Sequence, residues 1–502
     1  MHGRVSDART TVRDLSLLTL LVIAVLAWPL TAPPIGAHGE AREGLVVEHI
    51  VDHDRWILPL RNGEVPSKPP LFHWIAAAAS RLAGPSDAMV RVPSALAAWL
   101  VLVLVYLVGT AAGGRASGWF AVVALAGMHT FFESATEARV DMVFTAGVTL
   151  ALVAFLRWDQ PLVGPRRGPD LAGGYEHGGV DAARTDPAWA RALCYGALAA
   201  AVLTKGPAGA VLPGLVIVVY LAREGRLGRL RELWSPRLAL AAAAVVVGWY
   251  ALATWLGGSD FLARQIFHEN VDRFVGRGVF GMHGGRSRLT MVENLATDLL
   301  PWNLVLVWAA VRWWRGERED GVGRFLHTWW IVILLFFTAA YGKRGVYLLP
   351  LHPPIALLAG RALARLWAAL PPRPARTLVV GVATVAFAVA LVGQIVRVHR
   401  AGRQSLVPFG AEVAAIVPRA EPLVADASLD ESDLLVLAYR LGRDVPRVPA
   451  GACVAGAHRL ASPRDGADLG SVLVLSERRG VPVVLTRDPT PCPLAPESGN
   501  DR

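Results

Sequence analysis

Three lysines are the most unusual chemical groups in this sequence. Of its 50 Lys and Arg residues only three are lysine, and the other forty-seven are arginine. The lysines stand at the ends of long apolar segments, in the motifs Ser67-Lys68-Pro69-Pro70, Thr204-Lys205-Gly206-Pro207 and Gly342-Lys343-Arg344. A lysine presents a compact ammonium that acts on phosphate as a point charge, whereas arginine binds through a planar fork. The lysines therefore indicate positions that require a compact cation, unless they are remnants scattered at random.

The composition indicates a polytopic membrane protein. The chain has 502 residues, of which 54% are hydrophobic, and its mean hydropathy is +0.42. Several apolar stretches approach the roughly 20 residues that are needed to cross a bilayer. The net charge of +10 does not indicate nucleic-acid binding, because the arginines lie in short loops between apolar segments rather than on one basic face.

The apolar segments predict an all-α bundle with about eleven or more membrane crossings. We expect crossings near residues 15–33, 88–111, 117–133, 140–157, 188–204, 207–222, 238–256, 291–311, 325–341, 346–366 and 377–396. The first resembles a signal peptide or signal anchor, and we expect it to be retained because no cleavage site is convincing. Segment 70–84 is short and predicts an interfacial or re-entrant helix.

The arginine-rich loops alternate along the chain, which places the N-terminus and these loops in the cytoplasm. All three lysines then lie on the outer side. We expect residues 1–400 to form the membrane domain, with a first outer loop at 34–87, a cytoplasmic linker at 158–188 and a further outer loop at 258–290.

The last part of the chain differs in composition from the rest. Residues 401–502 contain short apolar runs separated by Gly, Pro and Asp, which predicts a small α/β domain on the outer face. Cys453 and Cys492 fall in this domain, and either a disulfide or two free thiols fits the sequence. Cys194 lies in an apolar segment and is expected to be a small buried side chain.

The first outer loop concentrates polar residues. Positions 40–53 predict a short amphipathic helix at the membrane surface. A solvated loop would explain these charges, but it would not explain why Lys68 directly precedes two prolines. Because Pro69 and Pro70 fix the backbone and prevent a helix from continuing through them, we expect Lys68 to be held at the mouth of the bundle.

A series of motifs resembles the lipid-linked sugar transferases that are related to the aminoarabinose transferase of lipid A and to protein mannosyltransferases. The first is Trp56-Ile-Leu-Pro-Leu-Arg-Asn-Gly-Glu-Val-Pro-Ser-Lys68-Pro-Pro-Leu-Phe-His-Trp74. Matches follow in the same order at Arg91-Val-Pro-Ser94, Ala138-Arg-Val-Asp141-Met142, Leu203-Thr-Lys205-Gly-Pro207, Phe267-His268-Glu269-Asn270, Leu300-Pro301-Trp302, Lys343-Arg344 and Tyr347-Leu-Leu-Pro350. Each motif is weak alone, whereas their order across roughly residues 15–370 is specific.

The resemblance implies a GT-C glycosyltransferase. Such an enzyme is a helical membrane bundle in the bacterial cytoplasmic membrane, with its active site facing outward between the first loop and the bundle. The implied sugar donor is a polyprenyl-phosphate sugar, and the acceptor is a lipid, a glycan or a protein. Membrane lipids are implied partners, and nucleic acid is not.

The resemblance also assigns roles to individual residues. Negative charge builds on the phosphate as the sugar leaves, so preorganised cations would stabilise the transition state. The expected phosphate-binding residues are Lys68, Lys205, Arg42, Lys343, Arg344 and Tyr347. Asp141 is the expected acceptor-activating carboxylate, and Glu40 is expected to orient Arg42 and the donor. Glu43 and His268 are expected to support the site. Alternatively, Asp141 is only the ion-pair partner of Arg139 or Arg91.

Two positions depart from the family pattern. Gly39 stands where the family usually has an aspartate before the glutamate, which leaves Glu40, Glu43 or Asp141 as the base. Ser67 stands where the family usually has an acidic residue before the lysine, which removes an expected metal ligand. Because His268 alone does not make a metal site, we expect no cofactor and no tightly bound divalent ion.

Two other functions fit the charges in this sequence. A transporter or flippase would also line its substrate path with ionisable residues, but it predicts charges on both faces and a repeated half, and neither is present in the sequence. The loss of the aspartate at Gly39 also fits an inactive relative that binds a lipid phosphate.

The expected sidedness can be tested by labelling. Ser67→Cys, Phe267→Cys and Gly342→Cys should each react with a membrane-impermeant thiol reagent in intact cells, above the labelling of the unchanged chain. Gly168→Cys, in the predicted cytoplasmic linker, is the matched control and should stay unlabelled. Labelling of any of the first three only after the cells are opened would disprove a single outward-facing site.

Overall fold

The computed structural model describes most of the chain in two compact units. The described residues are 2–31, 33–160, 188–277, 289–315, 319–369, 406–450, 452–462, 472–478, 481–490 and scattered positions between 377 and 396. The helical unit comprises Met1–Trp28, Ser67–Phe72 and Arg91–Gln394, and the mixed unit comprises Pro29–Pro66, His73–Val90 and Ile395–Arg502. By packing, most of the first outer loop therefore groups with the C-terminal residues.

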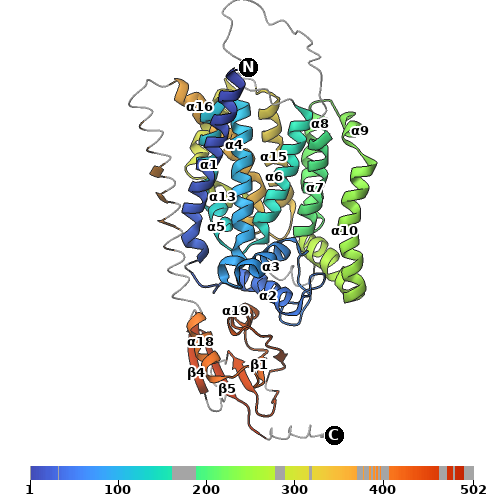
Figure 1. The fold of residues 1–502 in the computed structure, drawn as a ribbon, viewed down its shortest axis with the longest axis vertical. Coiled ribbons are helices and arrows are strands. Elements are labelled where there is room, and N and C mark those ends of the chain that lie inside the picture. Colours follow the sequence, from blue (N-terminus) through green and yellow to red (C-terminus); the bar gives the residue numbers. More distant parts are fainter. Residues whose placement is uncertain are drawn as a thin grey trace, which may run out of the picture. The chain divides into compact units, whose positions relative to one another are not determined.

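The helical unit is built from long and short helices, and in Figure 1 several of the long ones run side by side. Along the chain they are α1 (His2–Thr31), α4 (Asp87–Ala126), α5 (His129–Thr136), α6 (Val140–Asp159), α7 (Ala188–Lys205), α8 (Ala208–Arg223), α9 (Arg229–Leu233), α10 (Pro236–Gly257), α11 (Ser259–Leu262), the π-helix η1 (Ala263–Asp272), α12 (Arg273–Val275), α13 (Thr290–Asp298), α14 (Trp302–Trp314), α15 (Gly321–Ala339), the 3-10 helix η3 (Gly345–Leu351) and α16 (His352–Ala369).

The centre of this unit is the packing of α6 against α7, which also contacts α8 and α10. On the other side of α8 lies α15, which in turn packs against α16 and η3. Aromatic rings fill part of this core, where Phe155 and Tyr220 meet edge to face and both contact Phe325. Such pairs add to the stabilisation that comes from burying their area.

Six of the described helices are long and apolar enough to cross a membrane, which agrees with the predicted polytopic bundle. One of them, α4, covers two of the expected crossings, because its backbone leaves the helical region at Gly114 (φ 81°, ψ 171°). A non-glycine residue would be strained at this φ. On either side the chain folds closely, since a β-carbon at Gly109 would lie 2.9 Å from the Cα of Gly118.

The full number of crossings stays a prediction. The helix α8 coincides with an expected crossing but has only 16 residues. The expected crossing at 377–396 lies largely outside the described residues, and so does the expected linker at 158–188.

The mixed unit combines two helices of the first loop with a small sheet domain. The expected helices at 40–53 and 70–84 correspond to α2 (His38–His53) and α3 (Leu71–Ala83). The C-terminal elements are α18 (Val407–Ile416), β1 (Leu423–Asp426), α19 (Glu431–Leu441), β2 (Arg447–Val448), β3 (His458–Ala461), β4 (Val472–Arg478) and β5 (Val481–Arg487). The sheet order is β2-β1-β3-β5-β4, in which β1 pairs in parallel with β2 and β3, and β5 pairs antiparallel with β3 and β4.

The helix α19 is bound to the first loop through Asp87. The hydroxyl of Tyr439 donates to Asp87 Oδ1 at 2.8 Å, and Arg440 Nη2 donates to Asp87 Oδ2 at 2.7 Å. The Ile35 amide also donates to Asp87, and the Ile35 carbonyl accepts from Arg440 Nε. The ring of Tyr439 lies so close to α2 that a β-carbon at Gly44 would come within 2.5 Å of it. In the sheet domain, Cys453 is disulfide-bonded, and Cys492 lies outside the described residues.

Glu48 introduces a titratable group into this packing. The side chain is half-buried on α2. Burial raises the pKa of Glu48 to about 8, the negative charges of Asp52 and Asp87 act in the same direction, and the charges of Arg440 and Arg419 oppose them. The folded protein therefore holds a proton on Glu48 that the unfolded chain releases near pH 4.5.

The raised pKa predicts that stability falls as pH rises from about 4.5 to about 8, because in this range the folded state binds more protons than the unfolded state. Thermal unfolding of the full chain in detergent at pH 6.0 and pH 8.5 measures the loss. Glu48→Gln should show a smaller loss than the wild type. Glu412→Gln, at an exposed position of α18, should keep the wild-type difference. An unchanged difference in Glu48→Gln would show that Glu48 does not carry this dependence.

Candidate active site

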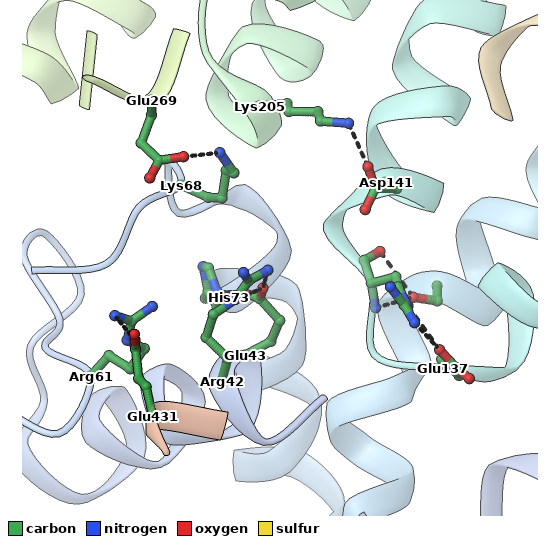
Figure 2. A network of polar contacts seen from close by, with 12 residues as sticks. Arg42, Glu43, Arg61, Lys68, His73, Glu137, Asp141, Lys205, Glu269 and Glu431 are labelled. Atoms are coloured by element: carbon green, nitrogen blue, oxygen red, sulfur yellow. Dashed lines mark hydrogen bonds and ion pairs between the residues drawn. The ribbon is translucent and has the colours of Figure 1, made fainter. Parts of the chain in front are cut away.

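Asp141 and Lys205 form an ion pair where α6 begins and α7 ends. Asp141 lies in the first turn of α6, and Lys205 is the last residue of α7. The Lys205 ammonium donates to Asp141 Oδ1, and the two side chains are only 14% and 13% exposed. Figure 2 shows Lys205 reaching from its helix end toward the carboxylate. A carboxylate in a first turn also interacts favourably with the positive end of the helix dipole.

Two aromatic rings complete the surroundings of Lys205. Its Nζ lies 5.0 Å from the centre of the Phe144 ring, one turn beyond Asp141, and 4.7 Å from the centre of the Tyr347 ring on η3. Both distances fit cation–π contacts. A compact ammonium suits a space between one carboxylate and two rings, whereas a guanidinium is larger and planar. This geometry agrees with the prediction that Lys205 occupies a position that requires lysine.

The start of α6 is fixed by the Arg91-Val-Pro-Ser94 motif. The hydroxyl of Ser94 donates to the Arg139 carbonyl at 3.2 Å and accepts from the Arg139 amide at 3.1 Å. The side chain of Arg139 pairs with Glu137, at 2.7 Å between Nη2 and Oε2. The bonded partner of Asp141 is therefore Lys205 rather than Arg139, which was one of the alternatives left open by the sequence.

The turn between α7 and α8 sets the position of Lys205. Gly206 has φ 75°, which lets the chain reverse directly after the lysine. Three residues later, a β-carbon at Gly209 would lie 2.3 Å from the backbone carbon of Ala201. Glycine therefore allows α8 to approach α7 closely enough to hold the turn.

Lys68 forms a second ion pair. Its Nζ lies 2.9 Å from Oε2 of Glu269 on η1, and each side chain is 13% exposed. Figure 2 shows the Lys68 and Glu269 side chains pointing toward each other from two separate segments. The neighbouring His268 is 64% exposed and pairs with Asp272, at 2.7 Å between Nδ1 and Oδ2. The predicted outer loop at 258–290 therefore contacts Lys68 through Glu269. His268 bonds to Asp272 within η1 instead.

The remaining predicted cations of this unit lie between α15 and η3. Lys343 Nζ donates to the Ala340 carbonyl at 2.8 Å, at the end of α15. Arg344 precedes η3, is exposed, and acts on Asp141 through its charge. Of the predicted site residues, Asp141, Lys205, Arg344 and Tyr347 thus lie near one another, and their roles stay predictions.

The mixed unit contains a separate polar cluster on α2 and α3. Arg42 Nε donates to Glu43 Oε1 at 2.9 Å, and His73 Nε2 lies 2.7 Å from Glu43 Oε2. Glu43 is 3% exposed and His73 is fully buried. Burial acts to raise the pKa of Glu43, but the charge of Arg42 and the bonded His73 outweigh it and hold that pKa well below its usual range. The carboxylate bonded to Arg42 is therefore Glu43, while Glu40 is buried on the same helix.

The donor set does not fit a divalent metal ion. Ser67 offers no carboxylate next to Lys68, and His268 is exposed and bonded to Asp272. Within the part of the chain that the structure describes, no three His, Cys, Asp or Glu side chains gather as a metal site would require. The expectation of no tightly bound ion stays a prediction.

Comparisons with known proteins find relatives among the sugar transferases that the motifs resemble. Residues 67–160 match the dolichyl-phosphate-mannose-protein mannosyltransferase family. The undecaprenyl phosphate-alpha-4-amino-4-deoxy-L-arabinose arabinosyl transferase 2 of Pseudomonas fluorescens is 30% identical over 353 residues, which cover 69% of this chain and 59% of that protein. The corresponding transferase of Shewanella sediminis is 25% identical over 350 residues, with coverage of 69% and 59%. The match thus spans less than two thirds of these relatives.

Solved structures extend the likeness over nearly the whole chain. ArnT from Cupriavidus metallidurans bound to undecaprenyl phosphate matches with a TM-score of 0.74 at 20% identity, covering 94% of this chain and 97% of ArnT. The chain has an ArnT-like fold, and its sequence is similar to those of the aminoarabinose transferases. The oligosaccharyltransferase of Archaeoglobus fulgidus is more distant, with a TM-score of 0.51 at 12% identity over 88% of this chain and 64% of that one. The predicted resemblance and fold class are confirmed.

The aminoarabinose-transferase-like fold holds residues that the sequence alone did not single out. Glu269 stood inside a matching motif, but the role predicted for that motif was given to the neighbouring His268. Ser94 also stood in a motif without a stated role, and Glu137 lay outside the motifs. An acidic residue next to a family-matching histidine is the signal that would have identified Glu269.

The close contact at Gly209 predicts a stability effect. Gly209→Ala places a methyl group against the α7 backbone, so the helices must separate and the turn at Lys205 must shift. The melting temperature of the purified chain should fall by several degrees, corresponding to about 1–3 kcal/mol. Gly214→Ala is the matched control on the same helix, because a β-carbon there meets no atom within 4 Å. Equal melting temperatures for the two variants would contradict the packing.

Proposed function

We propose that the protein transfers a sugar from a polyprenyl-phosphate donor to a hydroxyl of a lipid, glycan or protein acceptor. The observation that carries this proposal is the Asp141–Lys205 pair, which places a carboxylate and a compact cation together between Phe144 and Tyr347. It occurs in the fold of ArnT, which was crystallised with undecaprenyl phosphate.

The charges of the helical unit suit a phosphate ligand. Its motifs contribute the cations Lys68, Arg91, Arg139, Lys205, Lys343 and Arg344. Glu269, Glu137 and Asp141 pair with Lys68, Arg139 and Lys205, so that within this set the cations outnumber the carboxylates. A polyprenyl phosphate would supply the missing negative charge, and it gains more of that charge as the sugar leaves.

The reaction needs one proton acceptor and a stabilised leaving group. The acceptor hydroxyl oxygen attacks the anomeric carbon of the donor sugar, and the bond from that carbon to the phosphate oxygen breaks. The bonding electrons leave with the polyprenyl phosphate, whose charge Lys205 and Lys68 stabilise. Asp141 accepts the hydroxyl proton and so becomes neutral as the phosphate gains charge, which leaves the charge of Lys205 to the phosphate.

The roles of Glu40 and Arg42 rest on the sequence resemblance. We expect Arg42 to contribute to binding of the donor, with Glu40 orienting it. The bond from Arg42 to Glu43 supports a preorganised guanidinium, because Glu43 is itself held by the buried His73.

We further propose that the protein lies in a bacterial cytoplasmic membrane with this site facing outward. The alternation of the arginine-rich loops supports this orientation. The disulfide at Cys453 agrees with an outer location of the sheet domain, because disulfides persist in oxidising compartments.

The decisive experiment measures transfer by the purified full chain with a panel of polyprenyl-phosphate sugars and a membrane extract as acceptor. Asp141→Asn should lower turnover about a hundredfold, the loss typical of a general base, while the affinity for donor changes little. Asp320→Asn, which removes the carboxylate of the Arg361 pair, is the matched control and should transfer normally. No transfer by the wild type with any donor, or full activity of Asp141→Asn, would overturn the proposal.

A further inference from the structure

Lys68 has a counter-ion of its own. Glu269 Oε2 lies 2.9 Å from its ammonium, and both side chains are largely shielded from solvent. A phosphate that binds Lys68 would come close to this carboxylate, and two anions at short range in a shielded site repel each other strongly. Binding of the donor phosphate to Lys68 therefore requires Glu269 to move away.

The other lysine pair is built differently. Asp141 stands at a helix start that Ser94 fixes by two hydrogen bonds, and Lys205 lies between two rings. Neither group can withdraw without disturbing this packing. Of the two lysines, Lys68 is thus the one whose counter-ion can be exchanged.

The segment that carries Glu269 is suited to movement. It is a π-helix. This form is rare in proteins overall, and where it occurs it is often at a functional site. Phe267 and Val271, on either side of Glu269, are 57% and 44% exposed. Gln265 is buried, and its carbonyl accepts from Asn270 Nδ2 at 2.8 Å, a hydrogen bond within the segment itself. A segment with few buried apolar side chains opens locally at low cost.

We propose that Glu269 is an exchangeable counter-ion of Lys68. It neutralises the lysine while no donor is bound, yields it to the donor phosphate, and returns when polyprenyl phosphate leaves. The exchange keeps a negative charge beside this shielded cation at each stage, which favours its burial. Glu269 also competes with the product, polyprenyl phosphate, for Lys68, and this competition promotes release of the product. This inference rests on the proposed function and adds to it a residue that governs donor entry and product exit.

The test is the affinity of the purified full chain in detergent for undecaprenyl phosphate. Glu269→Gln keeps the shape of the side chain and removes its charge, so the dissociation constant should fall about fivefold to tenfold, the size expected when one competing charge is lost. In steady-state transfer, KM for the sugar donor and kcat should fall together, because the product leaves more slowly. A residue with only a structural role would not lower the dissociation constant.

Asp272→Asn is the matched control, because it removes a carboxylate from the same π-helix at the exposed His268 pair. Its affinity for undecaprenyl phosphate should equal that of the wild type. Glu269→Asp keeps the charge on a shorter side chain and should bind about twofold more tightly than the wild type. If Glu269→Gln does not fold, Glu269→Asp decides the question.

The outcomes separate this inference from the proposed function. Affinity equal to or weaker than that of the wild type in the Glu269 variants, with normal binding and transfer by the wild type, overturns the role of Glu269 alone. Absence of undecaprenyl phosphate binding by the wild type overturns the proposed function as well.

Discussion

The ion pair between Asp141 and Lys205 is the constraint on which the helical unit depends. Two shielded charges tolerate each other's burial only when they are held in contact, since separating them would leave an uncompensated charge in a poorly polarisable interior. The features around them serve this contact: Ser94 fixes the start of α6, Gly206 turns the chain after α7, and Gly209 lets α8 pack closely. The same arrangement gives the proposed transfer a preorganised carboxylate and cation.

Much of the fold was predictable because its signals are local. Apolar length predicted the bundle, and the helices over residues 40–53 and 70–84 correspond to α2 and α3. The motifs named Asp141, Lys205, Arg344 and Tyr347 as site residues, and these four lie near one another in the structure. The break of α4 at Gly114 was less visible, because a single glycine in an apolar run can equally be tolerated within a helix.

The pairing of charges was not predictable in the same way. Nothing in the spacing of Lys68 and Glu269, which are far apart along the chain, indicates that they meet. The same holds for Asp87, which accepts hydrogen bonds from Tyr439 and Arg440 of the C-terminal domain. Such contacts depend on which helix ends the tertiary structure brings together, and a single sequence contains no record of them. Glu43 illustrates the point: its bond to His73 joins two helices, whereas the sequence suggested a supporting acid or one of three candidate bases.

The binding of α19 to the first loop has a consequence for how the protein is made. Residues 29–66 and 73–90 leave the ribosome early, but the helix that completes their packing belongs to residues 395–502 and is synthesised last. Domains usually fold as soon as their residues have emerged, from the N-terminus onward. Here the first loop lacks its contacts with α19 while the intervening helices enter the membrane. Until then Asp87 and the face of α2 at Gly44 are not covered by Tyr439 and Arg440. A ribosome that stops before α19 would therefore release a protein whose bundle helices are complete and whose first loop is unfinished.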